Sequence, residues 1–556
     1  MPYADLIIEN AALLTFADTP EPCNALAIKD EHILALGTRA QMYDLKGPDT
    51  RIIDAAGNTV LPGFIESHIH LFPGGFELGL LNLASCTSMD QVSQMVRAYA
   101  AQNPDQDLLY AIGGNYGMLG DGVSIDRHGL DQVMPNRPFA VLAADHHTVW
   151  ANTAALHLAG IASGAKVSAG SQITMGADGL ATGELLEPGA YEYILAKTSL
   201  GGRDMLGMTT GADPSPPASP QQRVADKNAL RAGLKHLASF GITTFHNMDG
   251  NFYQLELLSE LQAEGDLLCR GQIPFHLKAF DSIDRLDEAD DMRRRYNSDW
   301  LWSGRLKLFH DGVCESGTAA MLQPYPNWPD SHGAPVFAPD QFRDICVRAD
   351  KMGLQISVHA IGDAANRETL DAFEAARDAN GARDSRHRIE HVEILHPDDV
   401  ARFGHLGVIA SMQPPHSPAA GLFPPPPKGM LLHEDQKPQM FRWDVLRAAA
   451  PRLIFSSDWP VVPVDVMAGV RAAVAPIKLD PPWVDHPQDL IATLKSYTAD
   501  GAWAEFSEYR KGCLAPGMMA DIAILSQDVT KIAPETLDQV KAKMTLCAGR
   551  PTHDTL

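Results

Sequence analysis

Two histidines separated by one residue are the first sign of chemistry in this sequence. His68 and His70 lie in the segment FIESHIH, whose alternating apolar residues are typical of a buried strand. Residues two apart in a strand point to the same side, so both imidazoles can bind one divalent cation. The pair alone is weak evidence for a metal site, because buried histidines often make only ordinary hydrogen bonds.

Four further polar residues lie at or near the ends of predicted strands. His359 follows LQISV, His391 follows HRIE, Asp458 follows LIFSS, and Lys307 lies within RLKLFH. A single charged residue at such a place is usually a transition from strand to loop. Several of them, with side chains that suit a metal ion, indicate a site where the strands end.

A set of predicted strands and helices must position these residues. The alternation favours a parallel (β/α)8 barrel, in which the active site lies at the carboxyl ends of the strands. The histidine pair would lie on the first strand, Lys307 on the fourth, His359 on the fifth, His391 on the sixth and Asp458 on the eighth. The predicted strands are 63–70, 242–247, 274–280, 305–310, 355–359, 387–392, 408–413 and 453–457, and the predicted helices between them are 223–240, 340–352, 366–380 and 397–403.

The segments outside this pattern predict additional domains. Short alternating runs near both ends of the chain favour a small β-sandwich domain formed by residues 1–60 and 510–556. The barrel would then span 61–509. The interval 72–222 after the first strand is too long for a loop, so we expect an inserted subdomain there.

Composition limits the possible partners and location. The chain has 556 residues and a net charge of −24, so it lacks the basic surface of a nucleic-acid binder and is a poor match for anionic membranes. No stretch approaches the roughly 20 apolar residues of a membrane helix. The seven cysteines include no CxxC, and the first residues do not read as a secretory signal. We therefore expect a cytoplasmic protein.

The ordered motifs resemble the amidohydrolase superfamily. The chain looks most like the branch with the YtcJ-like proteins and N-substituted formamide deformylases. Two departures are Glu66, where the branch often has Asp, and His146, where it often has Gly. The matching segments include LPGFIESHIHL (61–71), ADHHTVWAN (144–152), LKLFHDG (306–312), VHAIGDAAN (358–366), HRIEH (387–391) and FSSDWP (455–460).

The resemblance implies a metal-dependent hydrolase with two metal ions, for which zinc suits the ligands best. His68 and His70 would bind one ion, and His359 and His391 the other. Lys307 would bridge the two as an N6-carboxylated lysine. Asp458 would contact the first ion and act as general base. Iron, manganese or a single metal ion remain open.

The implied reaction is hydrolysis of a non-peptide carbon–nitrogen bond in a small molecule, namely an N-substituted amide, a formamide or a cyclic amide. Alternatives are an ester, lactone or carbamate hydrolase, a lyase or isomerase with the same site, and a non-catalytic metal-stabilised scaffold. A homodimer is a common state for soluble enzymes. Candidate substrate-binding residues, each of which also has an ordinary structural interpretation, are His147, Trp150, Tyr116, Asp311 and His416.

Overall fold

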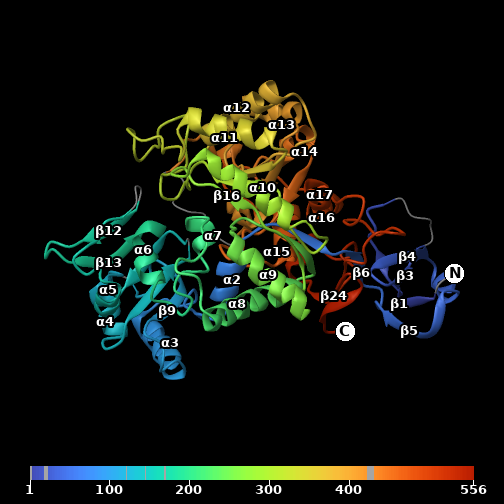
Figure 1. Ribbon diagram of the computed structural model, residues 1–556, viewed down its shortest axis with the longest axis horizontal. Coiled ribbons are helices and arrows are strands. Elements are labelled where there is room, and N and C mark those ends of the chain that lie inside the picture. Colours follow the sequence, from blue (N-terminus) through green and yellow to red (C-terminus); the bar gives the residue numbers. More distant parts are fainter. Residues whose placement is uncertain (1–2, 18–22, 121, 145, 168–170, 422–430) are drawn as a thin grey trace. The chain divides into compact units, whose positions relative to one another are not determined.

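The computed structural model (Figure 1) describes residues 3–17, 23–120, 122–144, 146–167, 171–421 and 431–556. The chain divides into two compact units. The first comprises Met1–His70 and Leu234–Leu556, and the second comprises Leu71–Gly233. None of the helices within the described ranges is both long and apolar enough to cross a membrane.

The centre of the first unit consists of two parallel sheets. One has the order β17-β15-β14-β7, and the other the order β16-β18-β19-β20-β21-β22. Most of these strands are buried on both faces, as is usual for parallel strands covered by helices. Their bounds are β7 (Phe64–Ile69), β14 (Ile242–Asn247), β15 (Arg270–Gln272), β16 (Phe275–His276), β17 (Leu301–Trp302), β18 (Arg305–Phe309), β19 (Gln355–Ala360), β20 (Arg388–His391), β21 (Ile409–Met412) and β22 (Leu453–Phe455).

The expected barrel is therefore only partly supported, because no closed ladder of strands is present in the described residues. The predicted third strand, 274–280, was wrong in its extent. The chain pairs first through β15 and again through β16, and Pro274 between them has no N–H to donate to a ladder. At the other edge, β7 meets the segment after β22 through an isolated parallel bridge between Ile69 and Trp459.

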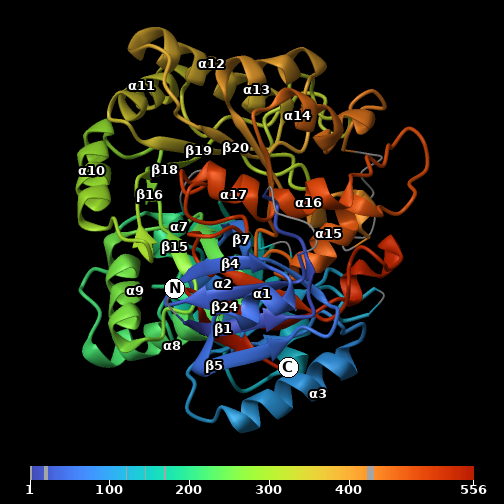
Figure 2. The same ribbon diagram turned by 90° about the vertical axis from the view of Figure 1, so that its right-hand side faces the viewer.

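Helices lie along the outside of these strands, and Figure 2 shows α10 to α13 beside β16 and β18 to β20. Helix α9 illustrates why they begin and end where they do. The Asn251 side chain accepts the N–H of Gln254 at its start, and Gly265 ends it with φ of 82°, a conformation that suits glycine. The helices of this unit are α9 (Phe252–Glu264), α10 (Leu286–Arg295), α11 (Pro339–Lys351), α12 (Asp363–Asn380), α13 (Val400–Leu406), α14 (Trp443–Ala449), α15 (Val466–Val474), α16 (Leu490–Ser496) and α17 (Ala499–Ala504).

Both ends of the chain contribute to two further sheets of the first unit. The order is β4-β3-β1-β5 in one sheet and β2-β6-β23-β24-β25 in the other. Residues from both sheets share one buried cluster that includes Ile8, Ile28, Ile524 and Leu546. The bounds are α1 (Arg39–Tyr43), β1 (Ala4–Glu9), β2 (Ala12–Leu13), β3 (Ala25–Lys29), β4 (His32–Gly37), β5 (Lys46–Asp54), β6 (Thr59–Pro62), β23 (Ile522–Leu525), β24 (Ala542–Cys547) and β25 (Arg550–Asp554).

The second unit is built on a mixed sheet with the order β12-β13-β11-β10-β9-β8. Two apolar clusters form its cores. Val141 belongs to one cluster and its neighbour Leu142 to the other, because successive residues of a strand point to opposite faces. Helix α8 (Pro220–Ser239) begins in this unit and ends in the first. The other elements are α2 (Leu71–Glu77), β8 (Leu81–Asn82), α3 (Met89–Gln102), β9 (Leu109–Gly114), α4 (Arg127–Val133), β10 (Phe139–Ala143), β11 (Thr148–Ala151), α5 (Thr153–Ala159), β12 (Gln172–Met175), β13 (Ala181–Leu186), α6 (Pro188–Leu195) and α7 (Leu206–Thr209).

Candidate metal centre

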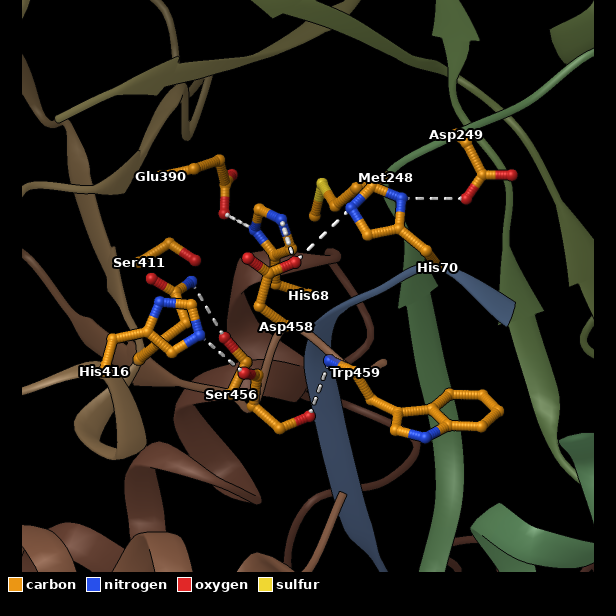
Figure 3. Close-up of polar contacts among 12 residues, drawn as sticks. His68, His70, Met248, Asp249, Glu390, Ser411, His416, Ser456, Asp458 and Trp459 are labelled. Carbon is orange, nitrogen blue, oxygen red and sulfur yellow. Dashed lines mark hydrogen bonds and ion pairs between the residues drawn. The ribbon is translucent and has the colours of Figure 1, made fainter. Parts of the chain in front are cut away.

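The two histidines of the HxH pair lie at the carboxyl end of β7, and both are buried. Their Nε2 atoms each lie 3.3 Å from Oδ1 of Asp458, which follows β22 (Figure 3). These separations are longer than a normal N–H···O hydrogen bond, and Oδ1 makes no hydrogen bond of good geometry among the described residues. Three possible ligand atoms therefore converge on one point.

Backbone contacts hold Asp458 against the histidine strand. Its N–H donates to the carbonyl of His68 at 3.0 Å, and the N–H of His70 donates to the carbonyl of Trp459 at 2.8 Å. Asp458 has φ of 66° and His391 has φ of 76°, values that residues other than glycine rarely adopt. Such strain is concentrated at functional sites, and here it occurs at two predicted metal ligands.

A second group of possible ligand atoms shares Asp458. One atom each from His391, His416 and Asp458 lie within 4.8 Å of one another. Nδ1 of His391 is buried and has no hydrogen-bond partner in the described part of the chain. Burial and the neighbouring histidines lower the pKa of His391, so its imidazole is neutral, the form that binds a metal.

His359 lies beside this second group, but its ligand atoms do not join it. Its ring centroid is 4.3 Å from that of His391, whereas its Nε2 lies 3.3 Å from the carbonyl oxygen of Gly312. The ring that joins His391 at Asp458 is that of His416, which the sequence suggested only as a substrate-binding residue. Metal ligation by His359 stays a prediction.

Lys307 is fully buried on β18, and its Nζ has no hydrogen-bond partner among the described residues. Its Nζ lies 4.5 Å from the centre of the Phe309 ring. Burial lowers the pKa of Lys307 to about 8, because the charged form is poorly solvated. A neutral amine is the form that reacts with CO2, so this environment suits carboxylation, which stays a prediction.

Two carboxylates behind the HxH pair fix the orientation of its rings. Nδ1 of His68 lies 2.9 Å from Glu390, and Nδ1 of His70 lies 3.1 Å from Asp249 (Figure 3). An Nδ1–H donated to a carboxylate leaves Nε2 free for a metal ion and makes it more basic. Burial lowers the pKa of His70, but the Asp249 and Asp458 carboxylates outweigh it and raise the value to about 9.

Sequence analysis missed both carboxylates. Asp249 lies two residues beyond the predicted second strand, where the same reasoning about polar residues after strands would have found it. Glu390 immediately precedes His391 in HRIEH. Its partner is His68 on β7, a different strand, so no local pattern indicated its role.

A chain of buried polar contacts extends from Glu390 away from the ligands. Arg388 donates to Glu390 and lies 3.0 Å, through Nη1, from Nδ1 of His246. Nε2 of His246 lies 2.6 Å from Glu505, and Lys511 donates to the Thr244 hydroxyl and forms an ion pair with Glu505 at 2.7 Å. Burial lowers the pKa of His246 to about 4, so this ring is neutral and accepts from Arg388.

Glu66 and Asp311 stabilise backbone segments next to the candidate ligands. The Ser457 hydroxyl donates to Glu66 at 2.7 Å, and burial raises the pKa of Glu66 to about 8. The Asp311 carboxylate accepts N–H groups of Ala320, Ile361 and Gly362 at 2.9–3.0 Å, and its Oδ1 lies 3.6 Å from Nε2 of His359. These contacts favour a positioning role for Asp311; its predicted contact with substrate is untested.

The other candidate substrate-binding residues belong to the second unit. Trp150 is buried in its core, and the Tyr116 ring packs edge-on against it at 4.9 Å. His147 lies 3.1 Å from Glu187, and His146 lies 3.1 Å from Glu77. Their predicted contact with substrate is likewise untested.

The donor set of the first unit fits a divalent cation. It combines neutral or carboxylate-oriented imidazoles, a shared aspartate oxygen, and buried atoms of Asp458, His391 and Lys307 that no other described group satisfies. Imidazole with carboxylate is a ligand set that zinc binds well. Fold and site together define a metal-dependent hydrolase of mixed α/β structure.

The chain belongs to the amidohydrolase family, whose sequence pattern matches residues 51–553. It is 27% identical over 551 residues to YtcJ of Bacillus subtilis (strain 168), covering 98% of each chain. It is 25% identical over 564 residues to the N-substituted formamide deformylase of Arthrobacter pascens, covering 98% of this chain and 97% of the relative.

A solved structure supports the fold. An uncharacterized metal-dependent hydrolase from Pyrococcus horikoshii OT3 superposes with a TM-score of 0.73 at 23% identity, and the match covers 95% of this chain and 99% of the other. The family match over residues 51–553 confirms the predicted family, and with it the predicted class of enzyme.

Proposed function

We propose that this chain hydrolyses a non-peptide carbon–nitrogen bond in a small molecule, namely an N-substituted amide, a formamide or a cyclic amide. The observation that carries the proposal is the convergence of ligand atoms from His68, His70, His391 and His416 on the carboxylate of Asp458. The relative from A. pascens is named as a deformylase of N-substituted formamides, which supports this type of bond.

The proposed architecture is a (β/α)8 barrel built from the two parallel sheets. The bridge between Ile69 and Trp459 supports closure between the first and last strands. We further propose the terminal β-sandwich as one domain and residues 72–222 as the core of an inserted one. We also propose a cytoplasmic location and a homodimer.

The proposed cofactor is zinc, with two ions per chain. His68, His70 and Asp458 would hold one ion. His391, with His359 or His416, would hold the other, and a carboxylated Lys307 would bridge them. When bound, such a cation acidifies water and polarises a carbonyl group.

Asp458 is the proposed general base. Burial raises its pKa, but His68 and His70 outweigh burial and hold it well below the usual range, so the carboxylate is ionised. It would accept a proton from the attacking water and deliver it to the leaving nitrogen. Expulsion of an amine requires that proton, because an amide anion is a very poor leaving group.

Paired substrates test the type of bond. Amides and esters with the same acyl group are assayed with the purified protein, with protein stripped by a chelator, and with stripped protein given zinc. We expect metal-dependent turnover that favours the amides. Preference for the esters would replace the proposal with an esterase, and a protein that neither takes up zinc nor turns over any member would favour the scaffold interpretation.

A further inference from the structure

Lys278 occupies a rigid position just beyond the carboxyl end of β16. Its N–H donates to Oδ2 of Asp281 at 2.9 Å, and the N–H of Asp281 donates back to the carbonyl of Lys278 at 3.0 Å. Arg285 pairs with the same Asp281 carboxylate at 2.9 Å. The turn that presents Lys278 is therefore held on both sides, and the Asp281 carboxylate of this turn already has a cationic partner.

The ammonium group of Lys278 has no ion pair of its own in the described residues. Its Nζ lies 5.1 Å from the centre of the Phe309 ring, and Nζ of Lys307 lies 4.5 Å from the same ring. Lys307 is fully buried, whereas Lys278 is partly exposed. Two amines thus share one aromatic ring, and of the two residues only Lys278 is partly exposed.

The register of the strands relates this lysine to the candidate metal centre. His276 is the partner of Lys307 in the parallel pair β16 and β18. Lys278 lies two residues after the end of β16, and its amine faces the ring of Phe309, two residues after Lys307. The Phe309 ring centroid lies 5.0 Å from that of His359, which lies 4.3 Å from that of His391. One aromatic ring therefore separates Lys278 from the candidate ligands, a spacing that suits a small substrate.

We propose that Lys278 binds an anionic group of the substrate, so that the preferred substrates are amides carrying a carboxylate several atoms from the bond that is cleaved. This inference rests on the proposed function and names its substrate class. Burial and the nearby Lys307 lower the pKa of Lys278 to about 7. An anion bound beside this amine, which has no carboxylate partner among the described residues, would pair with it and favour its charged form. In a chain with a net charge of −24, a local cation is needed to attract such a substrate.

The Phe309 ring gives the proposed subsite an apolar side. It lies next to both the Lys278 amine and the His359 ring, so it would face the part of the substrate between the carboxylate and the amide. An aromatic or short aliphatic spacer fits this arrangement better than a polar one.

Binding of benzoate and benzamide tests the subsite without requiring turnover. The two probes share size and ring and differ in charge, and calorimetry with the protein as purified gives their Kd values. We expect benzoate to bind at least about tenfold more tightly, Lys278→Met to abolish the difference and Lys278→Arg to retain it. Equal binding of the two probes by the wild type, or a preference that survives in Lys278→Met, would overturn the proposal.

Kinetics with 4-formamidobenzoate and its neutral analogue 4-formamidobenzamide separate this inference from the proposed function. In Lys278→Met, KM for the benzoate should rise about tenfold with kcat little changed, as expected for loss of uniform binding. If the protein hydrolyses neither these two compounds nor any other amide, the result counts against the proposed function. The preference for binding benzoate could still stand in that case. Equal kcat/KM for both compounds in the wild type would overturn only the role of Lys278.

Two controls test whether something other than the proposed subsite causes the change in benzoate preference. Lys351→Met removes the same charge from the exposed end of α11 and should leave the benzoate preference intact. Zinc content should be unchanged in Lys278→Met. If zinc is lost, the ammonium serves the Lys307 centre instead, and the proposal is wrong.

Discussion

Replacing Asp249 with asparagine tests whether the carboxylates behind the histidines set the metal affinity. Oδ1 of Asp249 lies 3.1 Å from Nδ1 of His70, and Oδ2 accepts from Nε2 of Gln254 at 3.1 Å. The amide of Asp249→Asn offers one oxygen to these two donors, so one buried donor is left without an acceptor. The substitution also removes the charge that makes His70 more basic.

The expected magnitude follows from these contacts. Loss of a partner behind a metal-bound histidine typically weakens metal binding about 10–100-fold, or about 1.4–2.7 kcal/mol. A buried donor without an acceptor reduces stability by about 1–3 kcal/mol. We therefore expect both effects in Asp249→Asn, the first on the Kd for zinc and the second on the unfolding free energy of the metal-free protein.

Zinc affinity is measured by competition with a chromophoric chelator, and stability by urea unfolding of the metal-free protein. Gln254→Leu is the matched control, because it removes the other donor to Asp249 but keeps the carboxylate. It should lower stability by a comparable amount and leave zinc affinity close to that of the wild type. The reasoning is refuted if Asp249→Asn loses stability but binds zinc as the wild type does.

Three other substitutions test the remaining roles. Asp458→Asn should lower kcat about 10²–10⁴-fold on the best amide of the panel, and wild-type turnover would exclude Asp458 as the general base. Elemental analysis of Lys307→Met should find one zinc ion instead of two, and an unchanged zinc content would contradict the bridging role. The substitution should not destabilise the metal-free protein. Burial lowers the pKa of Lys307 from 10.5 to about 8, so the buried ammonium is disfavoured by about 3 kcal/mol and its removal loses no stabilising charge. Burial lowers the pKa of His387 despite its contact with Asp350. The contribution of neutral His387 to the unfolding free energy is therefore complete above its pKa in the unfolded chain, about 6.5, and declines as the pH falls below that value. His387→Gln should therefore flatten the urea-measured stability between about pH 7.5 and 5.5, and an unchanged slope would argue against a neutral His387.

Strand positions could largely be predicted, because apolar strand segments bounded by polar residues are a local property of the chain. The predicted second strand matches β14 at both ends, Ile242 and Asn247. The third strand could not be placed in the same way. Its split at Pro274 depends on which neighbours pair with each half, and β15 and β16 pair with different strands.

The candidate ligands could be named from sequence because metal chemistry restricts the residue types and a parallel sheet brings the carboxyl ends of its strands together. That reasoning identified His68, His70, His391 and Asp458, whose ligand atoms the fold brings close to one another. It chose His359 as the neighbour of His391 and did not foresee that the His416 ring lies there. His359 lies on β19 and His416 follows β21, and the direction of each ring depends on contacts with Gly312 and Ser457.

The sequence alone was enough to identify the family, the enzyme class and the residue types at the ends of the strands. The tertiary structure alone decided which group holds each ring. Glu390 and Asp249 reach His68 and His70 across 322 and 179 residues of sequence, and no local pattern encodes such a pairing. The same holds for the amines of Lys278 and Lys307, which have no ion pair among the described residues, because a missing partner is a property of everything packed around a side chain.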